Sequence, residues 1–286
     1  MERLSPSEEE LVAQLAINPK FNGRPHPFPL RVSSHVEDMY FVGHHSEKTF
    51  GAVPYLLKSD TYGWIMVDTP EFSKSAVRAV EQLTGPDGPS YMLLTHVDDT
   101  TGHNKWKAQY PNLKRIFHSG DLGRHNWLGD ATLGEVEVLL QETSNEKNLQ
   151  FFDLNGASIA DPTSSKSRSS DDIPDVVLVH TPGHSPGSTS LWRRPKDSSD
   201  GVIFTGDTYA YTTRDGGRMT SFPRYGHDHG LQSQILPLLA KLDWSLVAPG
   251  HGHVRDYSPT TTSLEQRLED MQPALDELGS QSVLRR

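Results

Sequence analysis

Four apolar runs in this sequence end in a histidine or an aspartate that stands beside glycine, proline or a second acid. The turns that follow them are Thr95-His96-Val97-Asp98-Asp99, Thr181-Pro182-Gly183-His184, Thr205-Gly206-Asp207 and Pro249-Gly250-His251. An apolar, β-branched run is typical of a buried strand, and proline or glycine ends it abruptly. Such turns place their side chains at the edge of a sheet, where imidazoles and carboxylates can bind zinc or iron. The sequence therefore predicts one metal site assembled from distant parts of the chain.

The composition narrows the chemistry. The chain has 286 residues, no cysteine and a formal net charge of -10. Without thiolates, histidines and carboxylates must hold any metal. An acidic chain repels a phosphate backbone, so we expect a small-molecule substrate and no nucleic-acid partner. No serine nucleophile is expected, and the sequence does not indicate an oligomeric state.

The start of the chain predicts a location. Acidic residues at positions 8–10 differ from the basic and apolar start of a signal peptide. No apolar run approaches the roughly 20 residues of a membrane span. We expect a cytoplasmic protein with no membrane contact.

The predicted organisation is an N-terminal segment followed by one domain. Residues 1–35 should hold an accessory helix, which a capping box at Ser5-Pro6-Ser7-Glu8 would begin, and an extended lead-in. Residues 36–286 should form the domain. Residues 155–175 are rich in serine and charge, with too little apolar surface to fold, and they predict a flexible insertion.

Periodicity within the domain predicts two similar halves. Strands are expected at 39–42, 52–57, 64–68, 91–94, 115–118, 135–140, 149–154, 175–180, 190–192, 202–204 and 246–248. Helices are expected at 71–84, from about 106, at 231–242 and at 264–278. Strands covered by helices in each half imply the α/β class and an αββα sandwich with the site at one edge of the sheets.

The ordered set of turns resembles the metallo-β-lactamase-fold superfamily, including its glyoxalase II relatives. That superfamily has a histidine-rich loop, a TPGH turn, a TGD turn and a final GH turn, and these motifs occur here in that order. The resemblance covers about residues 36 to 255. It implies an αββα sandwich of the metallo-β-lactamase type and a site for one or two Zn²⁺ ions.

The first loop departs from the superfamily pattern HxHxDH. The residues aligned with its four ligands are His96, Asp98, Thr100 and Thr101, so only the first histidine is kept. Hydroxyls are poor zinc donors. His103 lies two residues beyond the expected histidine and would restore a ligand if the loop bulges. The loop is similar to a THxDDxxDH-like loop in a branch of the superfamily from photosynthetic organisms.

The resemblance implies a ligand set with one open choice. One ion would be held by His96, His184 and either Asp98 or Asp99, with Asp207 shared. The second ion would be held by His103 and His251. Whichever of Asp98 and Asp99 is not a ligand would take part in proton transfer.

Four further residues are expected beside the site. Asp68 ends a strand at the position where the resembled fold has an aspartate near the metal; a plain turn is the alternative. His227 and His229 precede a helix and either contact substrate or belong to an exposed N-terminal cap, which is the simpler account. His253 would point the same way as His251 if the backbone is extended, and would support that ligand.

The expected function is metal-dependent hydrolysis. A metal-bound hydroxide would attack the carbonyl of an ester, thioester or lactone while the ions stabilise the oxyanion. Two alternatives stay open: a mononuclear iron oxygenase of the persulfide dioxygenase type, and a non-catalytic binding protein on a degenerate site. Metal content distinguishes the three.

Overall fold

The computed structural model describes residues 28–43, 52–141, 148–163, 173–194, 201–213, 216–257 and 263–284. The predicted N-terminal accessory helix and the serine-rich centre of the predicted insertion, residues 164–172, lie outside these ranges. Within them, no helix is long and apolar enough to cross a membrane.

Two seven-stranded sheets form the centre of the described structure. The first holds, in spatial order, β1 (Leu30–Arg31), β2 (Met39–Phe41), β3 (Tyr55–Ser59), β4 (Gly63–Val67), β5 (Tyr91–Leu93), β6 (Lys114–His118) and β7 (Val138–Leu140). The second holds β16 (Arg255–Asp256), β15 (Leu246–Pro249), β12 (Val202–Gly206), β11 (Thr189–Arg193), β10 (Val176–His180), β8 (Gln150–Phe152) and β9 (Ser158–Ile159). A separate hairpin pairs β13 (Ala210–Thr212) with β14 (Arg218–Thr220).

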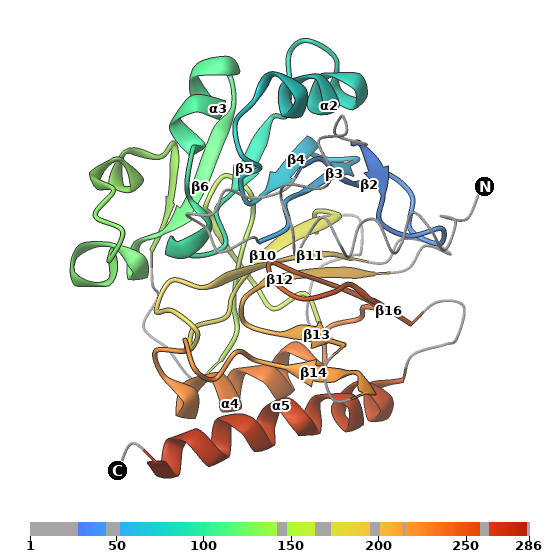
Figure 1. Ribbon diagram of the computed structural model, residues 1–286, viewed down its shortest axis with the longest axis vertical. Coiled ribbons are helices and arrows are strands. Elements are labelled where there is room, and N and C mark those ends of the chain that lie inside the picture. Colours follow the sequence, from blue (N-terminus) through green and yellow to red (C-terminus); the bar gives the residue numbers. More distant parts are fainter. Residues whose placement is uncertain are drawn as a thin grey trace.

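Helices cover the outer face of each sheet, so the chain forms four layers (Figure 1). The first sheet is covered by α2 (Lys74–Thr84) and α3 (His103–Gln109), and the second by α4 (His229–Leu239) and α5 (Leu264–Leu284). The predicted αββα sandwich of the α/β class is therefore confirmed.

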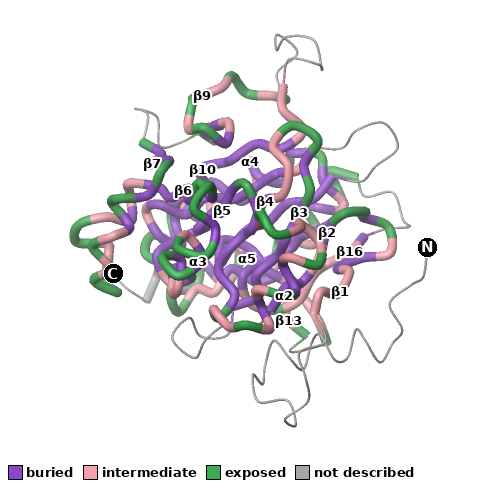
Figure 2. Tube along the Cα trace, turned by 90° about the horizontal axis from the view of Figure 1, so that it is seen from above, coloured by how far each residue is buried: buried purple, intermediate pink, exposed green. Residues whose placement is uncertain are grey.

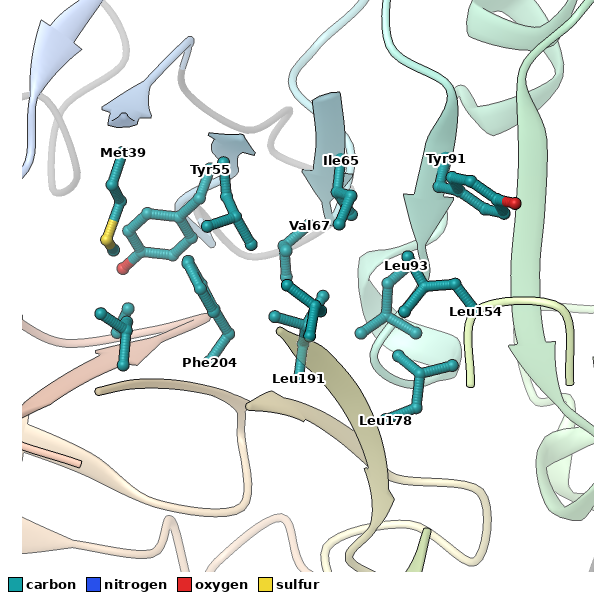
Figure 3. Close-up of a cluster of buried hydrophobic side chains, with 14 of the residues drawn as sticks. Met39, Tyr55, Ile65, Val67, Tyr91, Leu93, Leu154, Leu178, Leu191 and Phe204 are labelled. Atoms are coloured by element: carbon teal, nitrogen blue, oxygen red, sulfur yellow. The ribbon is translucent and has the colours of Figure 1, made fainter. Parts of the chain in front are cut away.

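Alternation along the strands explains the layers. In β10, Val176 and Leu178 join the cluster between the sheets, whereas Val177 and Val179 pack with α4 and α5. Successive residues of a strand point to opposite faces, so a strand buried on both faces is apolar throughout. Figure 3 shows the cluster between the sheets, where side chains from both sheets meet, and Figure 2 shows burial concentrated along the central strands.

The strand directions bring the predicted turns to one end of the sandwich. The opening meander β1–β4 is antiparallel as predicted, but β4, β5 and β6 run parallel. In the second sheet, β12 and β15 run parallel, and β10 shares their direction because β11 is antiparallel to both β10 and β12. The carboxyl ends of parallel strands meet at one edge of a sheet. The turns after β5, β10, β12 and β15 are those singled out in the sequence.

Two predicted helix features need correction. The helix expected from about residue 106 begins at His103, after Gly102 in the left-handed conformation (φ 90°), and its capping position lacks a side-chain hydrogen bond that would signal a start. The exposed cap expected at residues 227–229 is formed by Asp228, whose side chain accepts from Leu231 N, while His229 is buried.

Candidate metal centre

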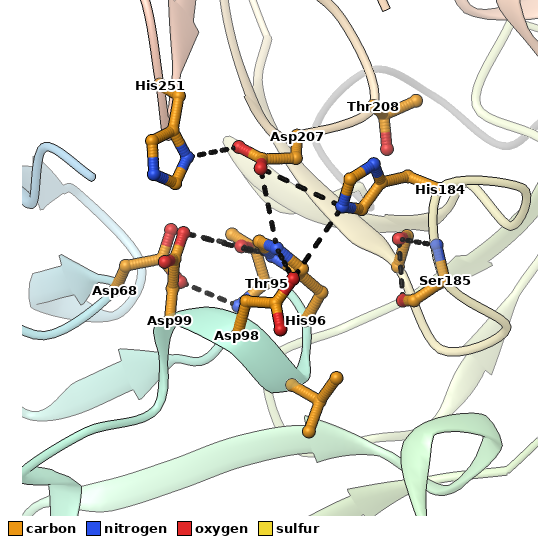
Figure 4. A network of polar contacts seen from close by, with 12 residues as sticks. Asp68, Thr95, His96, Asp98, Asp99, His184, Ser185, Asp207, Thr208 and His251 are labelled. Carbon is orange, nitrogen blue, oxygen red and sulfur yellow. Dashed lines mark hydrogen bonds and ion pairs between the residues drawn. The ribbon is translucent and has the colours of Figure 1, made fainter. Parts of the chain in front are cut away.

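Two groups of potential metal ligands lie where the turns meet. The first group is His96, His184 and Asp207, and the second is Asp99, Asp207 and His251; within each group the facing donor atoms lie within 4.8 Å of one another. Figure 4 shows these side chains pointing toward one another from four turns. Asp207 belongs to both groups, so its two oxygens can serve two ions.

The first group also includes Asp98 by distance. Asp98 Oδ2 lies 3.6 Å from His96 Nε2 and 4.0 Å from His184 Nε2. Asp207 Oδ2 lies 3.7 Å from each of the same two nitrogens. Ligands at about 2.0–2.2 Å from a tetrahedral zinc stand about 3.3–3.6 Å apart. The spacing of these four donors is therefore close to what one such ion requires.

The second group centres on a fully buried carboxylate. Asp99 is 0% exposed, and neither of its oxygens has a hydrogen-bond partner among the described residues. The other two members of this group lie close together, because His251 Nδ1 is 2.7 Å from Asp207 Oδ1. A Cβ on Gly250 would lie 3.1 Å from an oxygen of each aspartate, so the turn before His251 leaves little room for anything larger than glycine.

Buried nitrogen and oxygen atoms that have no hydrogen-bond partner show whether these residues suit a metal ion. His96 Nε2, both ring nitrogens of His184, His251 Nε2 and both oxygens of Asp99 are buried without a hydrogen bond in the described structure. Burying polar atoms without a partner costs about 1–3 kcal/mol each. Native structures satisfy such atoms with protein, water or an ion. Imidazole and carboxylate are the donors that zinc and iron take, so these residues fit a metal site.

The electrostatics reflect a crowded cluster of acids and imidazoles. Burial raises the pKa of Asp99 well above its usual value, although the nearby His96 imidazole opposes this shift. Burial also acts to raise the pKa of Asp98 and Asp207, but the imidazoles beside them outweigh it and hold both pKa values below the usual range. Burial disfavours the proton on His251, yet Asp207 raises its pKa to about 10. Together with Asp68, four carboxylates face three imidazoles here, an excess of acid that suits a bound cation.

Asp68 lies beneath the first loop. It is buried, takes the left-handed conformation (φ 57°) after β4, and accepts hydrogen bonds from Thr95 N and Thr95 Oγ1. Thr95 Oγ1 in turn lies 3.0 Å from His96 Nδ1. Asp68 thus orients the loop that carries His96. A Cβ on Gly206 (φ 49°) would come within 2.6 Å of Thr95 Oγ1, so the TGD turn packs directly on this loop.

His103 does not reach the cluster. Its Nδ1 lies 3.0 Å from Arg115 Nη1 and its Nε2 lies 3.1 Å from Asp130 Oδ2. Arginine only donates, so Nδ1 accepts and Nε2 carries the proton donated to Asp130. The expected bulge is absent because a 3₁₀ turn at Val97–Asp99 leads into α3, which fixes His103 on its first residue. In the second group, Asp99 occupies the role expected for His103.

The other three histidines that the sequence places beside the site lie around the candidate metal centre. The backbone N–H of His227 donates to His184 O and Gly183 O, and its exposed ring contacts His125 at 4.9 Å between centroids. His229 is buried at the start of α4. His253 Nε2 lies 3.3 Å from Thr213 Oγ1 rather than in either ligand group. The expected alternation with His251 fails because Gly252 between them has φ 88°.

Sequence reasoning missed two residues. Trp127, half-exposed, donates from Nε1 to Asp98 Oδ1 at 2.6 Å, and no local pattern signals this contact. Asp121 follows β6, is fully buried, and accepts hydrogen bonds from both histidine loops. The sequence did contain a signal for Asp121. Ser119-Gly120-Asp121 stands at the end of a strand, as the motif Thr205-Gly206-Asp207 does.

Ser185 illustrates why a motif needs its structural context. Gly183-His184-Ser185-Pro186-Gly187 matches the Gly-x-Ser-x-Gly pattern of serine hydrolases. Its hydroxyl, however, is fully buried and donates to Asp121 Oδ2 at 2.7 Å. Ser185 therefore supports the loop and is not placed as a nucleophile.

Comparison with known proteins identifies the fold. The FEZ-1 metallo-β-lactamase from Legionella gormanii is similar at a TM-score of 0.53 and 15% identity, over 91% of this chain and 98% of that one. The class B3 di-zinc metallo-β-lactamase LRA-12 from an Alaskan soil metagenome is similar at 0.51 and 16% identity, over 92% and 97%. No protein-family model and no curated protein sequence matches the chain. The chain has the metallo-β-lactamase fold, which confirms the resemblance found in the sequence.

Proposed function

We propose that this protein is a metal-dependent hydrolase that uses water to cleave the acyl C–O bond of an ester or lactone, or the acyl C–S bond of a thioester. The observation that carries this proposal is the convergence of buried, unpartnered imidazole and carboxylate atoms on two adjoining groups that share Asp207. A purely structural cluster would leave this desolvation cost without a compensating partner.

The proposal assigns the donors to two ions. The first would take His96, His184, Asp98 and Asp207, and the second would take Asp99, Asp207 and His251. When bound, such ions lower the pKa of a coordinated water, supply a nucleophile at neutral pH and stabilise the oxyanion. This proposal uses both Asp98 and Asp99 as ligands, so the proton transfer expected of the acid that is not a ligand is assigned to neither of them.

Neighbouring side chains orient these donors. Asp68 accepts a hydrogen bond from Thr95 and so holds it beside His96. The Trp127 indole donates a hydrogen bond to one oxygen of Asp98, and the other oxygen faces both imidazoles. The half-exposed Trp127, with the exposed Tyr225 and His227 on the loop before α4, offers contacts for a small-molecule substrate at this end of the sandwich.

Metal analysis tests the proposal. The wild-type protein, purified without added ions, should contain about two zinc ions per chain, and His184→Ala should lose the ion of the first group. His227→Ala is the matched control, because His227 is exposed beside the same turn and should leave metal content unchanged. A wild-type protein that binds no zinc when titrated would contradict the proposal and favour a binding role.

One specific outcome would favour an oxygenase instead. Two imidazoles and one carboxylate, the content of the group His96, His184 and Asp207, is the set that non-haem iron oxygenases use. A single iron per chain, with no zinc bound, would support that alternative.

A hydrolysis screen then narrows the substrate. The screen should include thioesters, lactones, β-lactams and phosphodiesters. We expect hydrolysis of a thioester, ester or lactone that a chelator abolishes and zinc restores. The same activity should be absent in His184→Ala and present in His35→Ala, which changes an exposed histidine on the loop between β1 and β2.

A further inference from the structure

Asp121 is a buried carboxylate that belongs to neither ligand group. It ends the 3₁₀ turn Ser119–Asp121 directly after β6 and is 0% exposed. Burial raises its pKa, although hydrogen bonds from Ser185 and from backbone N–H groups oppose this. A carboxylate at such a depth is costly unless its oxygens are satisfied.

Its hydrogen bonds come from the two loops that carry the imidazoles of the first group. Oδ2 accepts from Val97 N at 3.0 Å, in the residue after His96. Oδ2 also accepts from Ser185 Oγ at 2.7 Å, in the residue after His184, and Oδ1 accepts from Gly187 N at 2.6 Å. One side chain thus ties a loop of the first sheet to a loop of the second.

The contact is also tightly packed. A Cβ on Gly187 would lie 2.7 Å from Asp121 Cγ, and a Cβ on Gly120 would lie 2.8 Å from Pro186 O. Next to this contact, the rings of His118 and His180 stack at 3.9 Å between centroids. The two loops therefore have little freedom to move apart or to slide.

We propose that Asp121 is a positioning residue that fixes the separation of His96 and His184, and thereby sets the metal affinity of the first group. The two rings lie 5.0 Å apart between centroids, at 85° to each other. Groups that orient metal ligands typically change metal affinity by about 10–100-fold when they are removed. This inference rests on the proposed metal-binding function.

Asp175 provides a matched control. It lies directly before β10, at the opposite end of that strand from His184, and also joins the two halves of the sandwich. Its oxygens accept from Ser59 Oγ at 2.8 Å, Asp60 N at 2.8 Å and Thr61 N at 3.2 Å. Both aspartates therefore accept one serine hydroxyl and two backbone N–H groups, and only Asp121 adjoins the ligand loops.

The experiment compares Asp121→Asn with Asp175→Asn. Each metal-free protein is titrated with Zn²⁺ in competition with a chromophoric chelator. We expect Asp121→Asn to bind its tightest zinc about 10–100-fold more weakly than the wild type. We expect Asp175→Asn to remain within about twofold of it, even if both variants lower the melting temperature. Equal zinc affinity in the two variants would overturn the inference.

Cobalt loading gives a readout that a loss of stability alone would not move. The visible absorption of bound Co²⁺ depends on the geometry of its ligands. We expect a changed spectrum in Asp121→Asn and the wild-type spectrum in Asp175→Asn. An unchanged spectrum in Asp121→Asn would also count against the inference.

A milder variant covers the case in which Asp121→Asn does not fold. Ser185→Ala removes one of the three hydrogen bonds, and it should weaken zinc binding several-fold; wild-type affinity in it would overturn the inference. His184→Ala distinguishes a failure of the proposed function from a failure of the role given to Asp121. If the wild type binds no zinc, the proposed function is wrong. If the wild type binds zinc, His184→Ala loses the ion of the first group and Asp121→Asn binds as the wild type does, only the role of Asp121 is wrong.

Discussion

Two aspartates, Asp175 directly before β10 and Asp121 beside the loop that follows β10, have the same kinds of hydrogen-bond donor and opposite shifts in pKa. Burial also acts to raise the pKa of Asp175, but it is half-buried, and its hydrogen bonds, led by those from Thr61 and Ser59, lower the pKa. Asp121 is fully buried, and burial outweighs a similar donor set and raises the pKa. The same local chemistry therefore stabilises the sandwich at one end and is costly at the other. Such a cost is typical of sites shaped by function rather than stability.

Other polar groups at the two ends of the sandwich also differ in whether they have hydrogen-bond partners. At the Asp175 end, the carboxylate accepts three hydrogen bonds from one turn of the first sheet. At the other end, His96, His184, His251 and Asp99 present buried atoms without partners in the described structure. We therefore expect the metal-free protein to be weakened at the ligand end, and metal binding to offset that weakness.

The largest effect is expected from Asp207→Ala. Asp207 is common to both ligand groups, so its removal should lower zinc affinity by more than about a hundredfold, beyond the usual effect of a supporting residue. Asp175→Ala should leave zinc affinity unchanged. Chelator competition measures both. Similar affinities in the two variants would mean that the ends do not differ as described.

The next largest expected effect is a difference between the two ends in how their stability responds to acid. Burial lowers the pKa of His118 to about 3, with help from His180, and lowers that of His180 to about 4. The unfolded chain takes up these protons near pH 6.5, whereas the folded chain takes them up only near pH 3–4. The free energy of unfolding should therefore fall between pH 6.5 and 4, by on the order of 1 kcal/mol per pH unit for each histidine.

Denaturant unfolding at several pH values measures this dependence. His118→Asn keeps an acceptor for Gly120 N and should flatten the dependence in that window, while the exposed His35→Asn should not. Asp175, whose pKa is lowered, contributes stability above its unfolded pKa of about 3.9 that is lost only at lower pH. A wild-type slope in His118→Asn would show that the stacked pair is not the source.

Replacing an aspartate by asparagine should stabilise the metal-free protein at the ligand end and destabilise it at the Asp175 end. Burial keeps Asp99 from ionising, whereas the unfolded chain ionises it above about pH 3.9, so Asp99 costs stability at neutral pH; Asp99→Asn removes this cost, and the metal-free protein should gain about 1–3 kcal/mol in free energy of unfolding at pH 7 while losing zinc affinity. Asp175→Asn should lose stability, because its charged hydrogen bonds are removed. Melting temperatures with and without zinc test both. A loss of metal-free stability in Asp99→Asn would contradict the idea of a costly ligand end.

The smallest effect is expected from Trp127→Phe. The indole is half-exposed and donates one hydrogen bond to Asp98, so its loss should weaken zinc binding by less than about tenfold. Trp64→Phe is the control, since Trp64 lies on β4 and packs against Tyr40. If Trp127→Phe matches Asp207→Ala in its loss of zinc, Trp127 has a larger role than orienting one oxygen.

Most of the architecture could be predicted from the sequence. Apolar runs located eleven of the sixteen strands of the described structure to within a few residues, but they did not predict the short strands β1, β9, β13, β14 and β16. The helix of residues 71–84 is observed at Lys74–Thr84. Buried strands and amphipathic helices are dictated by local periodicity, which the sequence shows directly. The start of α3 was wrong, because a left-handed glycine without a side-chain cap leaves no local signal.

The candidate site could be predicted only in part. His184 and Asp207 stand on turns that strands end in, so their position at one edge followed from the pattern. The choice between Asp98 and Asp99 did not follow. A 3₁₀ turn rotates successive residues by about 120°, so Asp98 faces the first group and Asp99 the second.

The sequence by itself determined which donors this protein has, that thiolates are not among them, and that strands end beside them. Only the tertiary structure decided which donors meet, because that depends on the packing of two sheets and on loop rotations with no local signature. It placed His103 on Arg115 and Asp130, brought Asp99 into the second group, and joined the histidine loops through Asp121.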